Sequence, residues 1–123
     1  MYLNCHTWFS LRYGTFSEEA LCRLAKQLGV TSLAITDINN TSACLNFLKI
    51  APAYGIRPLL GIDFRNDHQT LYVGIAKNNE GYRELNEYLS YHLEHKIDFP
   101  ARAPHLKGCY FIYPFKQALL LFE

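Results

Sequence analysis

One short apolar run stands out in the pattern of hydrophobic and polar positions along the chain. Residues 33–35, Leu-Ala-Ile, follow Gly29 with no charge between, and the run ends abruptly in the polar stretch 37–40. An apolar run without alternation is typical of a strand buried on both faces, as in a parallel sheet covered by helices. Because α/β folds place ligands at the carboxyl ends of such strands, Asp37 and its polar neighbours are candidate site residues.

The region before this run has the pattern of one strand and one helix. Residues 2–5 are a short strand candidate, and a turn is expected at residues 13–15. Ser17 then fits the N-cap of a helix, and the two glutamates after it put negative charge in the first turn. Gly29 marks the end of this helix. We expect its apolar stripe to face the core, and the stripe comprises Ala20, Leu21, Leu24, Ala25 and Leu28.

A second helix and another strand follow the central run. The helix is predicted over about residues 41–50, with Pro52 and Gly55 closing it. The strand is predicted over residues 57–64. The order strand, helix, strand, helix, strand favours parallel strands joined by right-handed crossovers. The expected fold class is therefore α/β, as a layer or a barrel.

The second half of the chain is less regular. Residues 65–69 are polar and turn-like, and residues 70–76 alternate enough to form a strand that could pair as a hairpin with the strand before it. A third helix is predicted over about 78–95, and a loop over 96–107. A further buried strand is predicted over 109–113.

Length and composition narrow the class of protein. The 123 residues suffice for one domain with a real core, and no apolar run approaches the roughly 20 residues that cross a membrane. Met1 leads directly into a strand-like segment, so we expect no signal peptide. An unfinished helix is predicted over 115–123, and the chain stops inside its apolar run, which favours a fragment of a longer protein. We expect a soluble, cytoplasmic protein.

Charge and cysteine content argue against two kinds of site. Lys and Arg total 12 against 11 Asp and Glu, so the net charge of +1 lacks the excess that nucleic-acid binding usually requires. The four cysteines are widely separated and form no C-x-x-C pair, which argues against a zinc knuckle or a redox pair. We expect reduced, buried thiols.

Four segments stand in a familiar order: Tyr-Leu-Asn-Cys-His-Thr at 2–7, Ser-Leu-Arg-Tyr-Gly at 10–14, Leu-Ala-Ile-Thr-Asp-Ile-Asn-Asn at 33–40 and Gly-Ile-Arg-Pro-Leu-Leu-Gly-Ile-Asp at 55–63. They resemble the opening motifs of the PHP (polymerase and histidinol phosphatase) domain. The stretch 76–85, Ala-Lys-Asn-Asn-Glu-Gly-Tyr-Arg-Glu-Leu, is similar to the version of this domain at the N-terminus of bacterial DNA polymerase III α subunits. The resemblance implies that residues 1–123 are the N-terminal portion of one PHP domain, a partial (βα) barrel truncated after about five strands.

The resemblance also implies a chemistry. In free-standing relatives, His, Asp, Glu and Cys ligands at the strand ends gather two or three ions of zinc, manganese or iron, which activate water for attack on a phosphoester. In the polymerase subunits the domain accompanies a separate, magnesium-dependent polymerase site. The implied partners are the other domains of the same polymerase chain and a proofreading subunit of the replisome, with DNA reached only through the parent protein and no membrane.

The chain departs from the family pattern where the metal should be. Asn4 stands at the first position of the family's His-x-His, Tyr13 at an acidic position, and Ile38 at the histidine after Thr-Asp. Asp63 stands in place of a glutamate, and Phe115 in place of a cysteine. Ile, Tyr and Phe are not ligands that borderline metals bind, and a neutral amide suits them poorly.

The remaining polar groups form the remnant of a pocket. His6 and Asp63 are the obvious surviving ligands, with Asp37 and Asn40 as their supports. Two ligands are too few for a closed zinc site. We therefore expect Asn4, His6, Asp37, Asn40 and Asp63 to form a pocket with no catalytic residue and no metal in this fragment.

These groups also have structural interpretations. His6 and Asp63 could form a hydrogen-bonded pair that seals the barrel mouth, which we favour over metal binding. Asp37 with the two asparagines at 39–40 could cap the second helix or serve the pocket, and both roles stay open.

Two other sets of residues are expected to be structural. His92 and His95 lie three apart on the predicted third helix and could share a metal, but a solvated surface is favoured. Core and helix packing is favoured over base stacking for the tyrosines, namely Tyr82, Tyr88, Tyr91, Tyr110 and Tyr113.

Three functions follow from the sequence. The first is a non-catalytic scaffold and docking part of a replicative polymerase chain. The second is a metal-dependent phosphoesterase or proofreading exonuclease whose reduced ligand set is completed by later residues. The third is an α/β binding module that shares only the ancestry.

Overall fold

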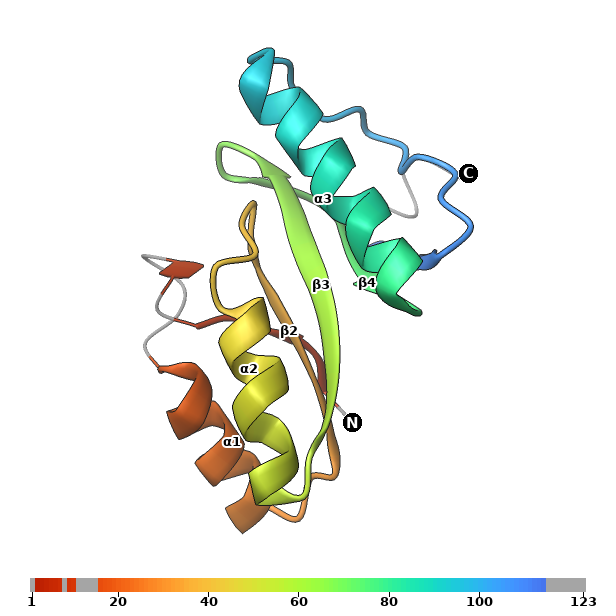
Figure 1. The fold of residues 1–123 in the computed structure, drawn as a ribbon. Helices are drawn as coiled ribbons and strands as arrows, with labels where there is room; N and C mark the ends of the chain where they lie inside the picture. Colours follow the sequence, from red (N-terminus) through yellow and green to blue (C-terminus); the bar gives the residue numbers. More distant parts are fainter. Residues whose placement is uncertain (1, 8, 11–15, 115–123) are drawn as a thin grey trace.

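The computed structural model describes residues 2–7, 9–10 and 16–114, with residues 2–4 described as backbone alone. Over these residues the chain is a mixed α/β structure in which one sheet carries helices on one side (Figure 1). The helix predicted over 115–123, the turn predicted at 13–15 and the family positions at Tyr13 and Phe115 lie outside the described residues.

A five-stranded sheet in the order β1-β2-β3-β4-β5 organises the described chain. β1 (Tyr2–Cys5), β2 (Ser32–Ile38) and β3 (Arg57–Asn66) are parallel to one another. β4 (Gln69–Ala76) is antiparallel to β3, and β5 (Cys109–Ile112) is antiparallel to β4. The predicted strand–helix alternation and the hairpin of β3 with β4 are therefore confirmed.

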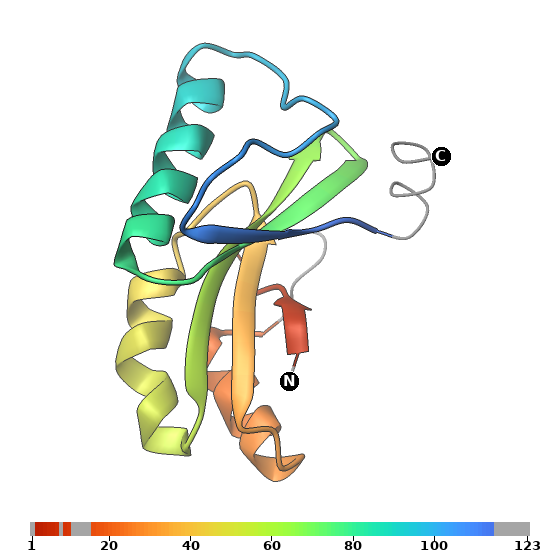
Figure 2. The same cartoon turned by 90° about the vertical axis from the view of Figure 1, so that its right-hand side faces the viewer.

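The α-helices α1 (Glu18–Gln27), α2 (Cys44–Ile50) and α3 (Asn79–Glu94) cover one face of the sheet (Figure 2). Ser17 caps α1 as predicted, because its side chain accepts a hydrogen bond from the Ala20 N–H. Asn78 caps α3 in the same way, accepting from the Gly81 N–H. None of the described helices is long and apolar enough to span a bilayer.

Two boundaries differ from the prediction. α2 begins at Cys44 rather than near residue 41 and continues into a short 3-10 helix, η2 (Ala51–Tyr54). β3 extends through Asn66, so the segment predicted as a turn contributes Arg65 and Asn66 to the strand.

The core between helices and sheet consists of two apolar clusters. One lies under α1 and α2 and includes Cys22, Leu33, Ile35, Phe47 and Leu60. The other lies under α3 and is built around Phe64, whose ring centroid lies 5.1–5.5 Å from those of three other aromatic residues, Tyr72, Tyr88 and Phe99. Leu33 and Ile35 belong to the first cluster, and Ala34 packs with Val73 and Ile75 on the other face of the sheet. The central run 33–35 is therefore buried, as predicted.

The predicted stripe of α1 is rotated. The helix buries Glu18, Cys22 and Ala25, whereas Leu24 and Leu28 remain exposed. α1 packs against α2 and η2 as well as the sheet, and this helix–helix contact takes the side that carries Cys22.

Two other burial predictions are wrong. The strand predicted as buried, β5, is at an edge of the sheet formed by the described residues, and Tyr110 within it is 63% exposed. His92, expected on a solvated surface, is 9% exposed. The loop after α3 returns over the helix and places Phe99 against the His92 ring, at a centroid distance of 4.9 Å.

Candidate functional site

The carboxyl ends of the parallel strands lie at one edge of the sheet and carry the predicted site residues. Ile38 is in register with Asp63, and Asp37 is in register with Ile62. Side chains in register share a face, and successive side chains alternate between faces. Asp63 therefore points to one face of the sheet and Asp37 to the other, so the structure does not bring these two carboxylates together.

Asp63 is fully buried and lies between an imidazole and a guanidinium. His6 Nε2 is 2.9 Å from Asp63 Oδ2. Arg65 donates from Nη2 to Oδ2 at 2.9 Å and from Nε to Oδ1 at 3.2 Å. This two-pronged contact is the strong geometry of an arginine–carboxylate pair. Both oxygens of Asp63 thus already have charged or polar partners.

Asp37 is 1% exposed and anchors the segment that follows β1. Its Oδ1 accepts from the Thr7 N–H and from Ser10 Oγ, both at 2.6 Å, and its Oδ2 accepts from Thr7 Oγ1 at 2.7 Å. Ser10 Oγ in turn accepts from the Ile38 N–H at 2.9 Å. A carboxylate with these three short bonds is a structural clamp between the end of β2 and the residues after β1.

The two asparagines after β2 hold backbone rather than a ligand. Asn39, at φ 50°, donates from its side chain to the Arg65 carbonyl oxygen and accepts from the Arg65 N–H. Asn40 accepts from the Ser42 N–H and donates to the carbonyl oxygens of Phe9 and Ile38. Asn40 therefore shapes the turn before α2, whose own N-cap, Ala43, makes no side-chain cap bond.

The fifth predicted pocket residue, Asn4, lies in β1, two positions before His6. Among the predicted residues, the structure thus joins His6 to Asp63 and places Asp37 and Asn40 in separate hydrogen-bond networks.

The donors at this edge do not fit the metal cluster that the family implies. His6 and Asp63 already bond each other, and Arg65 occupies both oxygens of the carboxylate. Within the described ranges, no three His, Cys, Asp or Glu side chains gather closely enough to hold a metal ion. A zinc site of four ligands, or of three and a water, needs more donors than this pair supplies.

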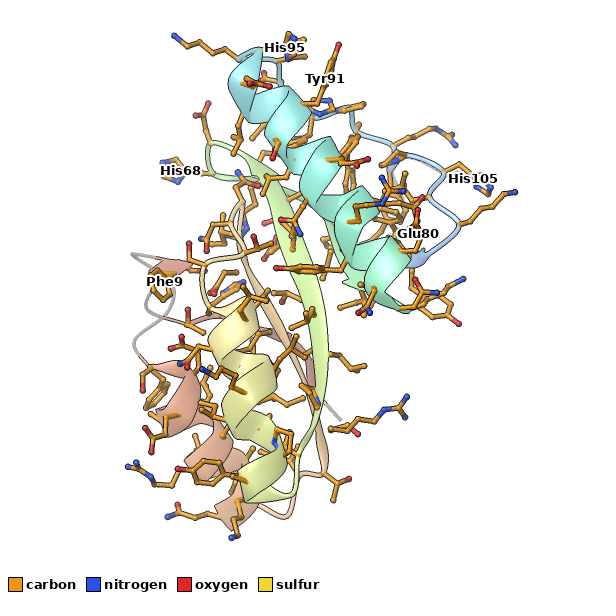
Figure 3. The ribbon with its side chains drawn as sticks, viewed as in Figure 1. Phe9, His68, Glu80, Tyr91, His95 and His105 are labelled. Carbon is orange, nitrogen blue, oxygen red and sulfur yellow. The ribbon has the colours of Figure 1, made fainter. Side chains whose placement is uncertain are left out.

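The other histidines lie elsewhere. Figure 3 shows His68, His95 and His105 on three separate segments, each directed away from the body of the protein. His92 is packed between aromatic rings, and its Nδ1 lies 2.9 Å from the Tyr88 carbonyl oxygen, to which it donates.

The cysteines are free thiols, as predicted, and three of the four are buried. Burial raises the pKa of Cys44 to about 12 and, together with the nearby Glu18 and Glu19, raises the pKa of Cys22 to about 11. Because the thiolate is the nucleophile and the metal ligand, these protonated thiols are inert at neutral pH.

The fold and this donor set define a mixed α/β domain with one imidazole–carboxylate pair at the carboxyl ends of parallel strands. The chain belongs to the PHP domain family, whose model matches residues 3–118.

Its relatives include bacterial replication proteins. The chain is 34% identical over 89 residues to the DNA polymerase III subunit alpha of Ureaplasma parvum, covering 72% of this chain and 9% of that relative. It is 33% identical over 96 residues to the same subunit of Pseudomonas aeruginosa, covering 73% of this chain and 8% of that relative. With the Vibrio cholerae subunit, at 29% identity, the shares are 88% and 10%. The chain thus spans about a tenth of the length of these curated relatives.

A solved structure supports the fold. A protein from Bifidobacterium adolescentis described as a metal-dependent phosphoesterase superposes with a TM-score of 0.53 at 20% identity, over 77% of this chain and 35% of that one. At this identity the likeness concerns the fold alone.

Sequence reasoning missed three residues of the site, Arg65, Thr7 and Ser10. For Arg65 a signal existed, because residues two apart in a strand share a face and Arg65 follows Asp63 by two. Thr7 and Ser10 lie in a segment without periodicity, and no local pattern ties them to Asp37.

Proposed function

We propose that this chain is the N-terminal PHP portion of a bacterial DNA polymerase III α subunit and that it serves DNA replication as a non-catalytic scaffold and docking surface. The similarity to bacterial DNA polymerase III alpha subunits and the match to the PHP model over 3–118 support this assignment. Polymerisation and its magnesium belong to the much longer remainder of such a chain.

The single observation that carries the non-catalytic role is the saturation of Asp63. Metal-dependent phosphoester hydrolysis needs closely placed cations that generate hydroxide and hold phosphoryl oxygens. Here the carboxylate that would hold such a cation bonds Arg65 and His6 instead, and Asp37 is taken by Thr7 and Ser10.

The domain is proposed to be part of a (βα) barrel. In Figure 2, β5 crosses the line of β2 and β3 steeply, so the sheet is strongly twisted. β1 and β5 stand at its two edges. Further strands of a longer chain could add to the edge strands of this twisted sheet and close it into a barrel.

The proposed partners follow from the parent protein. They are the other domains of the same cytoplasmic polymerase chain and a proofreading subunit of the replisome. DNA would be reached only through the parent protein, since the net charge of this portion is +1.

Metal content and hydrolysis test the proposal. The purified chain is equilibrated with MnCl₂ or ZnCl₂ and desalted, its metal content is measured, and bis(p-nitrophenyl) phosphate hydrolysis is followed. We expect less than one ion per chain and no metal-dependent release of p-nitrophenol. One tightly held ion that is lost in Asp63→Ala would contradict the proposal.

A metal-dependent phosphoesterase or proofreading exonuclease with a reduced ligand set is the second candidate. It is favoured by the His6–Asp63 pair, which lies where the family's ligands are expected. This candidate alone requires hydrolysis that rises with added metal and falls in Asp63→Ala.

A further inference from the structure

Arg65 holds the carboxylate of Asp63 from the same strand. The two residues are two positions apart in β3, Arg65 is 11% exposed in its side chain and Asp63 is fully buried. A guanidinium fork fixed on a buried carboxylate is both charged and geometrically matched to it.

A buried carboxylate requires a compensating charge. Leaving such a group unpaired, by removal of one partner of a buried pair, is strongly destabilising. In metal-binding proteins the cation itself supplies that charge and is often the largest charge in the site. Asp63 stands at the position where the family resemblance places a metal-binding carboxylate, and here its charge partner is Arg65.

We propose that Arg65 is a built-in counter-cation, which takes the place of a divalent ion at the end of β3 and thereby keeps a latent cation site closed. This inference rests on the proposed non-catalytic function of the same site. The geometry that supports it is that His6 Nε2 and Arg65 Nη2 both lie 2.9 Å from the same oxygen, Asp63 Oδ2. An ion that replaced the guanidinium would find a carboxylate and an imidazole together.

Removal of the guanidinium should therefore open the site. The test compares the wild-type 123-residue chain with Arg65→Gln, which keeps a polar side chain without charge, and with Arg65→Lys, which keeps the charge. Arg23→Gln is the matched control, since it removes an equal charge from an exposed ion pair with Glu19. Mn²⁺ is the probe because it favours oxygen and imidazole ligands over thiols.

Binding is measured from the loss of the free Mn²⁺ signal in electron paramagnetic resonance. We expect Arg65→Gln to bind one Mn²⁺ per chain with a Kd at least tenfold lower than that of the wild type, Arg65→Lys or Arg23→Gln. Adding Asp63→Asn to Arg65→Gln should abolish the gain. If Arg65→Gln is unfolded without metal, recovery of its native circular dichroism in MnCl₂ supports the proposal, and no recovery contradicts it.

Two results would separate this inference from the proposed function. The first result is that the wild type holds no Mn²⁺ and that folded Arg65→Gln binds Mn²⁺ no more tightly than the wild type does. This result overturns the counter-cation role and leaves the non-catalytic function intact. A wild type that already holds one Mn²⁺ as tightly as Arg65→Gln overturns both.

Discussion

Asp37 and Asp63 lie on neighbouring parallel strands, level with the carboxyl end of β2, but point to opposite faces of the sheet, because Ile38 is the residue in register with Asp63. Each carboxylate is buried and has its own partners, hydroxyl and backbone donors for Asp37 and charged or aromatic nitrogen donors for Asp63. One metal ion could not bind both. Their substitution should therefore affect stability in unrelated ways.

Asp37→Asn should destabilise the fold without affecting the Asp63 pair. The amide NH₂ would face donors that now share the carboxylate, which leaves at least one buried polar group unsatisfied. We expect a loss of about 2–3 kcal/mol in the free energy of unfolding, measured by urea denaturation.

Asp67→Asn is the matched control for that measurement. Asp67 is exposed in the turn between β3 and β4 and already has a positive φ, which asparagine tolerates. We expect a change within about 0.5 kcal/mol. Equal stability of the two variants would show that the Asp37 clamp contributes nothing.

Leu33→Asp should unfold the domain, since it places an unpaired charge in the cluster under α1 and α2, where Leu33 is 3% exposed. Leu45→Asp is the control, because Leu45 is 67% exposed on the first turn of α2. The helix dipole stabilises a carboxylate at that position. Circular dichroism should show a folded control and an unfolded Leu33→Asp. A cooperative thermal transition for Leu33→Asp would contradict burial of the central strand.

The sequence predicts local features of this fold well and long-range contacts poorly. The helix cap at Ser17 and the strand formed by the apolar run 33–35 depend on residues close in sequence. Cap chemistry and hydrophobic periodicity are therefore enough to predict them. The burial of His92 depends on Phe99, which the loop after α3 brings against its ring, and the exposure of Tyr110 depends on the place of β5 at the edge of the sheet that the described residues form. Periodicity contains neither. Burial of these residues could not be derived from their own segments.

The candidate site shows the same division. The family resemblance, which implies ligands gathered at the strand ends, is what predicts that His6 and Asp63 are neighbours. The face to which each carboxylate points depends on register, which a shift of one residue reverses for every side chain in the strand. Register is set by the whole sheet, so the separation of Asp37 from Asp63 became visible only in the structure. The contact of Arg65 with Asp63 does not depend on register, because the two residues lie two apart in one strand.

Gly81→Ala should be destabilising even though alanine is the better helix former. Propensity alone favours alanine by about 1 kcal/mol in a helix interior. A Cβ at Gly81, however, would overlap the Gly108 carbonyl oxygen, a backbone atom that cannot rotate away. Overpacking of this kind typically costs about 1–3 kcal/mol. We expect a net loss of up to about 2 kcal/mol in urea denaturation, the difference between these two effects.

Ser90→Ala is the control for the glycine substitution. Ser90 is exposed in α3, so alanine should leave stability unchanged or raise it slightly. If Gly81→Ala gains stability as Ser90→Ala does, then α3 does not pack closely on the residues before β5.

The buried thiols should make the fold less stable in alkali. The ordinary pKa of 9.0 is raised by burial to about 12 for Cys44 and to about 11 for Cys22, with smaller contributions from nearby carboxylates. A raised pKa in the folded state means that the protonated thiol is favoured there, so its contribution is complete below about pH 8 and is lost as pH rises through the folded value. Between about pH 9 and pH 11, each thiol should lower the free energy of unfolding by about 1.4 kcal/mol per pH unit.

Cys44→Ala provides the measurement, because tyrosines and lysines that also titrate in this range are unchanged in the variant. Urea denaturation at pH 8, 9, 10 and 11 gives the slope of the free energy of unfolding against pH for each protein. The variant should be less stable at pH 8, since it loses part of a buried side chain. Its free energy of unfolding should, however, fall less steeply with pH, by the contribution of one proton, about 1.4 kcal/mol per pH unit. Cys5→Ala, at a half-buried position, should change the slope less. Parallel slopes for wild type and Cys44→Ala would mean that the Cys44 thiol ionises as readily in the folded chain as in the unfolded one.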